Sequence, residues 1–311
     1  MKWIASSTPI SFPSLGLEIN PPLGFGFGNY EIRFYGVIIA IGLLLACIYG
    51  LRRKKAFGLT EDEIIDGALC IIPFAIICAR AYYCIFSWHE YAANPIEVLY
   101  IWKGGLAIYG GVIGAAIGIV TYCLIRKIPI GTCLDITSLG FLIGQSIGRW
   151  GNFFNREAFG AQTESFLRMG LNLTESGVAA SQVYFYHPTF LYESLWNLAG
   201  FVLLHFLSKK RKYDGQVALG YAAWYGLGRT FIEGLRTDSL YWGPFRVSQL
   251  LAAISCLAAV SILVWQAFRD HKEEDLYVNR VAARAAAAEA EKMEEAEDAV
   301  AETEDNTETE A

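Results

Sequence analysis

Seven stretches of mainly apolar residues, each about 20 residues long, constrain this 311-residue chain more than any other feature. A helix of that length measures about 30 Å, which matches the hydrocarbon core of a bilayer. The pattern therefore predicts an all-α integral membrane protein with seven transmembrane helices in a domain at residues 31–270. The predicted spans cover residues 32–51, 64–86, 106–125, 133–154, 188–207, 217–235 and 247–268.

Clusters of lysine and arginine follow only every second predicted span. They lie after the first, third, fifth and seventh spans, at residues 52–55, 126–127 and 209–212 and at Arg269 and Lys272. Because such clusters accumulate in cytoplasmic loops, we predict an N-terminus outside and a C-terminus in the cytoplasm. Residues 1–30 then form an irregular outer segment, and about 155–186 form an extracytoplasmic loop domain between helices four and five.

The net charge of −6 arises at the C-terminal end of the chain. Residues 289–311 carry eleven acidic residues and one lysine, a net charge of −10, so the remainder carries +4. We interpret residues 271–311 as an acidic cytoplasmic tail, with a helical Ala-rich part and disorder over 303–311. The seven cysteines lie mostly in apolar stretches without a CxxC pair, which indicates packing rather than a disulfide or metal site.

The fourth predicted span ends in polar sequence, GFLIGQSIGRWGNFFNREAFG at residues 140–160. Glycine recurs at 140, 144 and 148, a spacing that lines one helical face and allows a neighbouring helix to approach closely. Arg149 and Asn152 share a face near the outer end, and Glu157 follows. An interfacial arginine with Asn152 as a cap is the simpler interpretation, whereas the glycines and Glu157 favour a polar pocket.

The sixth predicted span contains a second set of ionisable residues. Arg229, Glu233 and Arg236 recur at i, i+4 and i+7 and form one stripe of a helix. Arg229 lies too deep in the span to extend easily to the surface, so it requires a partner or a polar cavity. A structural ion pair between Arg229 and Glu233 remains an alternative.

Three other spans contribute polar groups at a similar depth. These groups are Arg80 and Tyr83 in the second span, Tyr109 in the third, and the HPTFLYE sequence at 187–193 that opens the fifth. Two arginines in a cavity at membrane level suit an anionic group, most naturally a phosphodiester headgroup reached from the lipid bilayer. They also suit stabilisation of charge on a departing phosphate.

At this point the residues resemble a known family. GRWGNFFNREAFG is similar to the signature G-R-x-G-N-F-x-N-x-E-x-x-G of the prolipoprotein diacylglyceryl transferases. Four further family landmarks occur in the expected order, IRFYG at 32–36, GGLAIYGG, HPTFLYE and YGLGRTFIEGLR. The resemblance spans about residues 32–250.

The resemblance implies a multi-pass enzyme of the bacterial cytoplasmic membrane. It would transfer the diacylglyceryl group of phosphatidylglycerol to the lipobox cysteine of a prolipoprotein, forming a thioether and releasing glycerol phosphate. It implies no cofactor, no metal and no nucleic acid partner. By resemblance, Arg149 is the essential arginine that binds phosphatidylglycerol, Arg229 is the second essential arginine, Glu233 is its partner, and Tyr35 and Asn152 match important positions.

The chain also departs from the family pattern. Many members carry histidine where this chain has Tyr109, and tyrosine is a poor base unless its environment changes it. Arg156 stands where a small residue is common. Sequence leaves the proton acceptor open among Glu233, Glu157 and Tyr109, while Arg149 and Arg229 are expected to hold the lipid phosphate.

Two other function classes remain at this stage. A transporter of an anionic substrate would use the same buried arginines but would show inverted repeats or broken helices. A phospholipid synthase is suggested by Asp66-Gly67 and Ala79-Arg80, but its spacing is wrong and its further aspartates are missing. A structural scaffold would not need arginines at this depth.

Overall fold

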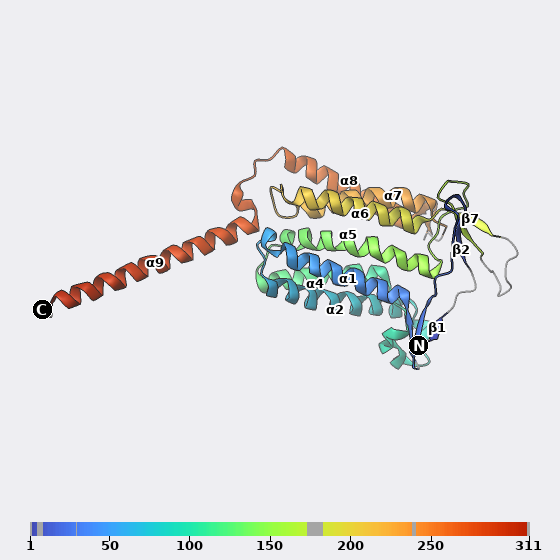
Figure 1. The fold of residues 1–311 in the computed structure, drawn as a ribbon, viewed down its shortest axis with the longest axis horizontal. Helices are drawn as coiled ribbons and strands as arrows, with labels where there is room; N and C mark the ends of the chain where they lie inside the picture. Colours follow the sequence, from blue (N-terminus) through green and yellow to red (C-terminus); the bar gives the residue numbers. More distant parts are fainter. Residues whose placement is uncertain (1, 5–8, 29, 173–182, 238–240, 310–311) are drawn as a thin grey trace.

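The computed structural model describes residues 2–4, 9–28, 30–172, 183–237 and 241–309. Within these ranges, seven long helices lie side by side and form the body of the protein (Figure 1). They begin and end within three residues of the predicted spans, because a long apolar segment satisfies its own backbone as a helix. They are α1 (Phe34–Arg53), α2 (Glu61–Phe86), α4 (Ile108–Arg126), α5 (Ile130–Asn155), α6 (Thr189–Ser208), α7 (Gln216–Leu235) and α8 (Val247–Ala267).

Six of these helices are long and apolar enough to cross a membrane, counted over the residues that the structure describes. The exception is α7, which at 20 residues is as long as α1 and α6. It carries Gln216, Arg229, Thr230 and Glu233, and its mean hydropathy stays below that of the six spans. The protein is thus a helical membrane protein with six clear spans, and α7 packs among them.

The all-α prediction is wrong at one end of the bundle, where short strands form three small sheets. The first sheet has the order β1-β4-β5, the second β3-β2-β6-β7 and the third β8-β9. Much of residues 1–30 is therefore strand rather than irregular. The strands are β1 (Lys2–Ile4), β2 (Ile10–Phe12), β3 (Leu17–Ile19), β4 (Gly24–Phe27), β5 (Tyr30–Arg33), β6 (Met169–Leu171), β7 (Tyr184–Tyr186), β8 (Tyr241–Trp242) and β9 (Phe245–Arg246).

The second sheet is fixed to the ends of α5 and α6 by a small core. Ile10 in β2 and Leu171 in β6 are fully buried and pair in register. They belong to one cluster with Phe153 of α5 and Phe190 of α6, whose rings lie 4.9 Å apart. We call this end of the bundle the strand end.

Glycines set the close helix pairs, as their spacing predicts. A Cβ atom at Gly114 of α4 would lie 2.3 Å from the Phe74 carbonyl oxygen of α2. On α5, a Cβ at Gly140 would meet Ala46 of α1 at 3.3 Å, and one at Gly148 would meet Ile39 at 3.1 Å. The glycine face of α5 therefore packs on α1, which leaves another α5 face for α6 and α7.

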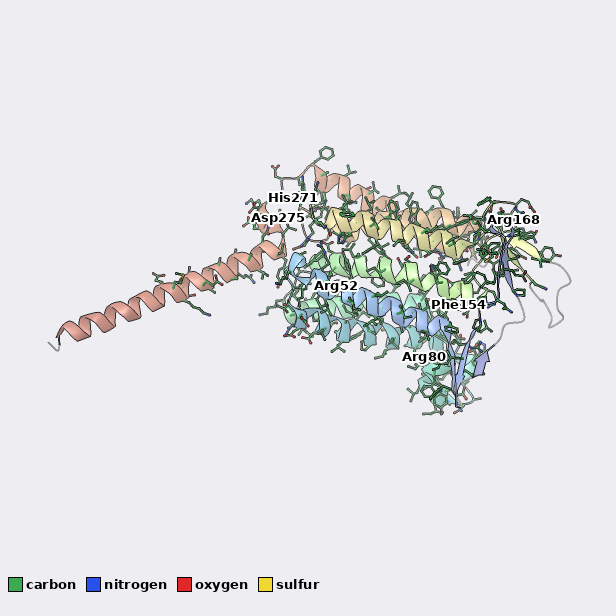
Figure 2. All side chains as sticks on the ribbon, viewed as in Figure 1. Arg52, Arg80, Phe154, Arg168, His271 and Asp275 are labelled. Atoms are coloured by element: carbon green, nitrogen blue, oxygen red, sulfur yellow. The ribbon has the colours of Figure 1, made fainter. Side chains whose placement is uncertain are left out.

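The basic clusters follow the C-terminal ends of α1, α4, α6 and α8, at the opposite end of the bundle, which we call the tail end and where Figure 2 labels Arg52. Arg53 donates to the Ser208 hydroxyl at 3.1 Å, and Arg211 donates to the Ala56 carbonyl at 2.8 Å, so the ends of α1 and α6 meet. From this end α9 (Tyr277–Thr309) extends away from the bundle. The structure describes α9 as far as Thr309, and the partly disordered tail stays a prediction.

Shorter helices complete the chain between the long ones. They are α3 (Trp88–Tyr91), η1 (Pro13–Leu15), η2 (Lys54–Phe57), η3 (Pro95–Leu99), η4 (Ile101–Lys103) and η5 (Glu273–Asp275). Two of them contact α9. The helix η2 leads into Gly58, where a Cβ would lie 2.6 Å from the Val278 Cα atom, and Asn279 of α9 donates to the Glu273 carbonyl of η5 at 2.8 Å.

Candidate active site

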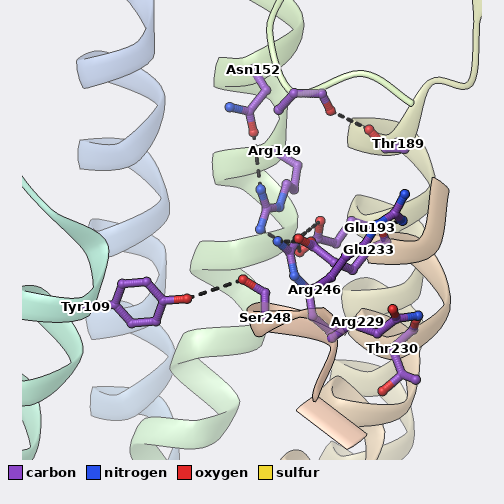
Figure 3. Close-up of polar contacts among 12 residues, drawn as sticks. Tyr109, Arg149, Asn152, Thr189, Glu193, Arg229, Thr230, Glu233, Arg246 and Ser248 are labelled. Atoms are coloured by element: carbon purple, nitrogen blue, oxygen red, sulfur yellow. Dashed lines mark hydrogen bonds and ion pairs between the residues drawn. The ribbon is translucent and has the colours of Figure 1, made fainter. Parts of the chain in front are cut away.

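A cluster of two arginines and two glutamates lies where α5, α6 and α7 meet (Figure 3). Arg149 Nη2 donates to Glu193 Oε1 at 2.5 Å, and Arg229 Nη1 lies 3.1 Å from Glu193 Oε2. Arg229 also forms an ion pair with Glu233, one turn further along α7. We call these four residues the charged cluster, and Glu193 joins its two arginines.

Local sequence explains why these side chains converge. Arg229 and Glu233 share a face of α7 because they are four residues apart. Gly228 brings α7 against α6, since a Cβ there would lie 2.1 Å from Trp196 Nε1. The indole of Trp196 donates to the Trp224 carbonyl at 2.9 Å, and Trp224 donates back to the Trp196 carbonyl at 2.9 Å. This reciprocal pair fixes α6 and α7 so that Glu193 lies opposite Arg229.

Burial differs sharply between the acidic and basic members of the charged cluster. The side chains of Glu193 and Glu233 are 2% exposed, whereas those of Arg149 and Arg229 are 19% and 15% exposed. The carboxylates therefore lie behind the guanidinium groups. Each guanidinium has five N–H donors, so donors remain for an anion that arrives on the exposed side. Such an arrangement binds phosphate with donors that are already oriented.

Asn152 and Glu157 extend the cluster toward the strand end. Asn152 Oδ1 accepts from Arg149 Nη1 at 3.4 Å, and Asn152 Nδ2 donates to Glu157 Oε1 at 2.9 Å. Asn155 donates to the same glutamate oxygen at 3.4 Å. Glu157 is exposed, and its contact with the arginines runs through Asn152.

Tyr35 and Tyr109 occupy different places relative to the cluster. The Tyr35 ring lies against α5, and a Cβ at Gly151 would come within 2.6 Å of it. Tyr109 is 39% exposed, and its hydroxyl lies 3.3 Å from the Ser248 hydroxyl at the start of α8. In Figure 3 Tyr109 stands apart from the arginines. Its predicted role as proton acceptor has no support from its contacts.

We predicted that Arg80 would lie with the polar groups of the other spans, but its side chain contacts a loop instead. Its guanidinium donates to the backbone carbonyls of Val98, Glu97, Gly104 and Gly105 at 2.7 to 3.0 Å. Four acceptors from one loop mean that Arg80 organises the connection between α2 and α4.

Arg156, which departs from the family pattern, also has a structural role. It adopts a left-handed backbone conformation with φ of 56° after the end of α5. Its side chain donates to Asn20 Oδ1 at 3.0 Å and to the Pro21 carbonyl at 2.8 Å. Arg156 therefore attaches the N-terminal segment to α5.

Sequence reasoning assigned no role to Glu193 or Arg246, which the structure places at the site. Arg246 Nη1 donates to the Glu233 carbonyl oxygen at 2.5 Å, and Gln249 donates to the Thr230 carbonyl at 2.9 Å. Arg246 and Gln249 thereby stabilise the last two turns of α7. One signal could have identified Arg246 from the sequence. It is an arginine at the start of the seventh predicted span, whereas the basic clusters follow the ends of spans.

In the described part of the chain, no three or more His, Cys, Asp or Glu side chains lie together in a way that could hold a metal ion. These residues therefore offer no candidate set of metal ligands. All seven cysteines carry free thiols. The ligand that the charged cluster suits is an anion.

A bundle of apolar helices that holds two arginines paired with buried glutamates defines a helical membrane protein with a charged cluster among its helices. The family model for prolipoprotein diacylglyceryl transferases matches residues 22–265. Because this match covers most of its length, the chain belongs to the prolipoprotein diacylglyceryl transferase family.

Three relatives carry the name phosphatidylglycerol–prolipoprotein diacylglyceryl transferase. The one from Listeria monocytogenes is 40% identical over 255 residues, which are 81% of this chain and 91% of the relative. Those from Ligilactobacillus salivarius and Limosilactobacillus reuteri are 42% and 41% identical over 260 and 264 residues. These alignments cover 82% and 84% of this chain and 96% and 95% of the relatives.

Proposed function

We propose that this protein transfers the diacylglyceryl group of phosphatidylglycerol to the lipobox cysteine of a prolipoprotein. Family membership supports this activity, and the single structural observation that carries it is the pair of partly exposed arginines backed by buried glutamates. The same membership favours a transferase over a transporter of an anionic substrate.

The charged cluster provides the phosphate site. Arg149 and Arg229 donate to the phosphate oxygens of the lipid, and Glu193 holds the two guanidinium groups at a fixed separation. The cysteine sulfur attacks the glyceryl carbon that bears the phosphate ester. A carbon–sulfur bond forms, the carbon–oxygen bond breaks with its electron pair remaining on oxygen, and glycerol phosphate leaves. The arginines stabilise the charge that develops on the departing phosphate.

Glu157 is the proton acceptor for the thiol in this proposal. It is exposed and accepts hydrogen bonds from Asn152 and Asn155 on the same oxygen, so its second oxygen is available. Glu193 and Glu233, in contrast, are occupied by arginines. A carboxylate at this position removes the thiol proton and leaves the thiolate, which is the nucleophilic form.

Orientation in the membrane follows from the charge at the two ends. We infer that α7 is a seventh span and that the tail end, with its basic clusters, lies in the cytoplasm. The strand end then faces outward in the bacterial cytoplasmic membrane, where a lipobox peptide arrives. Residues 31–270 form the catalytic domain, residues about 155–186 belong to its outer loop, and α9 forms the cytoplasmic tail.

The test uses purified protein in nanodiscs that contain phosphatidylglycerol and a fluorescent lipobox peptide. We expect a peptide product with one diacylglyceryl group per cysteine and an equal amount of glycerol phosphate. Arg149→Ala should lower kcat/KM by about 100-fold or more, because a donor to the developing charge is lost. Near wild-type turnover by this variant would contradict the assigned role.

A second measurement tests the proton acceptor. Glu157→Gln keeps the hydrogen-bonding shape but not the basicity, so kcat should fall by about 100-fold. The KM for phosphatidylglycerol should remain close to the wild-type value. An unchanged kcat would remove Glu157 from the mechanism.

A further inference from the structure

A second polar layer lies one helical turn from the charged cluster, on its tail side. Gln145 precedes Arg149 by four residues on α5, Asn197 follows Glu193 by four residues on α6, and Tyr225 precedes Arg229 by four residues on α7. Residues four apart share a helical face. Because α5 and α6 run in opposite directions, these steps lead the same way along the bundle. We call Gln145 and Asn197 the amide layer.

Asn197 is buried and Gln145 is partly buried, yet much of the hydrogen-bonding capacity of the amide layer is unused. Asn197 is fully buried, and neither its Oδ1 nor its Nδ2 atom has a partner. Gln145 donates from Nε2 to the Tyr221 hydroxyl at 3.0 Å, while its buried Oε1 atom has no partner. Buried amides without partners are costly to a folded protein, so their presence here requires a reason.

Neighbouring polar groups in the same helices are fully paired. Ser146 donates to the Ser194 carbonyl at 2.9 Å, and Ser194 donates to the Ser146 carbonyl at 2.8 Å. The indoles of Trp196 and Trp224 pair in the same reciprocal manner. The packing between α5 and α6 and between α6 and α7 therefore satisfies these polar groups, whereas the unpaired atoms of Gln145 and Asn197 lie one turn from the charged cluster.

We propose that the amide layer binds the hydroxyl groups of the alcohol esterified to the lipid phosphate. This inference rests on the proposed function and assigns its headgroup specificity. A carboxamide offers two N–H donors and an acceptor oxygen, and a diol offers two O–H donors with their acceptor oxygens. The unused atoms of Asn197 and Gln145 therefore match the glyceryl diol of phosphatidylglycerol.

Distance and charge both fit this assignment. One helical turn rises about 5.4 Å, which is about the length of a three-carbon alcohol attached to a phosphate held by Arg149 and Arg229. The amides are neutral, so they bind a hydroxyl without a charge of their own.

The experiment compares two lipid donors that differ only in the headgroup hydroxyls. Phosphatidylglycerol carries a diol, whereas phosphatidylpropanol carries the same three-carbon chain without hydroxyls. Wild-type protein in nanodiscs should favour phosphatidylglycerol by about 10- to 100-fold in kcat/KM, because a site built for hydroxyls rejects an analogue that lacks them. Asn197→Leu should reduce this preference to within about threefold while retaining transfer from phosphatidylpropanol.

Two further variants make the comparison decisive. Gln145→Met probes the amide layer independently, in case Asn197→Leu impairs folding. It should also reduce the preference for phosphatidylglycerol over phosphatidylpropanol. Thr132→Val is the matched control, since Thr132 is equally buried in α5 and its hydroxyl also lacks a partner. It lies at the tail end, far from the charged cluster along α5, and should keep the wild-type preference. Size-exclusion profiles and thermal unfolding verify that each variant is folded.

The outcomes separate this inference from the proposed function. A wild-type protein that uses both lipids equally would overturn the inference and leave the transferase intact. Folded Asn197→Leu and Gln145→Met variants that lose activity on both lipids in the same proportion would also overturn it, because the amides would then serve the bundle or bound water alone. Absence of transfer from either lipid by the wild type would defeat both proposals.

Discussion

Replacing Glu193 with glutamine tests whether one carboxylate holds the two arginines in place. The substitution preserves size and one acceptor but removes the charge that pairs with Arg149 and Arg229. Removing one partner of a buried ion pair costs about 3–5 kcal/mol. Because the arginine side chains retain 19% and 15% exposure, we expect the lower end of that range, about 3 kcal/mol of unfolding free energy.

The same substitution should have the opposite effect on anion binding. The charged cluster changes from no net charge to a charge of +1, and one carboxylate no longer competes with a phosphate for the guanidinium donors. A unit charge at a short distance near a protein surface contributes up to about 4 kcal/mol. We therefore expect Glu193→Gln to bind glycerol phosphate at least about 10-fold more tightly.

Two assays on the same preparations measure these effects. Equilibrium unfolding by SDS in mixed micelles gives the change in stability, and isothermal titration in nanodiscs gives the affinity for glycerol phosphate. Glu157→Gln is the control for stability, because Glu157 is exposed and should change unfolding by no more than about 0.5 kcal/mol. A Glu193→Gln variant as stable as the wild type, or one with weaker anion binding, would refute the arrangement described for the cluster.

Three further substitutions address residues around the site. Tyr109→Phe should leave kcat within about twofold, since its hydroxyl contacts Ser248 rather than the arginines; a loss of about 100-fold would restore it as a base. Gly151→Ala should destabilise the protein by about 1–3 kcal/mol through overlap with the Tyr35 ring, seen in thermal unfolding; unchanged stability would show that the ring moves freely. Arg80→Lys should accelerate proteolysis of the α2–α4 loop, because lysine cannot serve four carbonyls at once; equal cleavage rates would contradict this role.

Helix positions were predictable because each depends on a continuous apolar stretch. The observed α5, Ile130–Asn155, extends the predicted 133–154 by only a few residues. Strands were not predictable, because their partners are distant in sequence. Ile10 in β2 pairs with Leu171 in β6, and no local pattern around either residue identifies the other.

Site residues were predictable where a charged side chain lay inside an apolar span. They were missed where a charged side chain lay near the end of a span. Arg149 and Arg229 stood out because arginine is costly inside an apolar span, and Glu233 stood out by its spacing from Arg229. Glu193 lies within two turns of the start of α6, where a polar residue is ordinary, so only the structure identifies it as the bridge between the arginines. Tyr109 lay at a plausible depth, but its hydroxyl faces α8.

The pairing of β2 with β6 has a consequence for the order in which the protein is completed. Ribosomes add about 5–20 residues per second, so β2 leaves the ribosome about 10–30 seconds before its partner β6 exists. During that interval β2, whose Ile10 and Phe12 are buried in the finished protein, can pair only with β3, and its other edge has no partner. The second sheet at the strand end is thus begun first and completed late, after the long helices α1, α2, α4 and α5 have been made. A chain released before residue 169 lacks β6, so one edge of β2 remains open to chaperones and proteases.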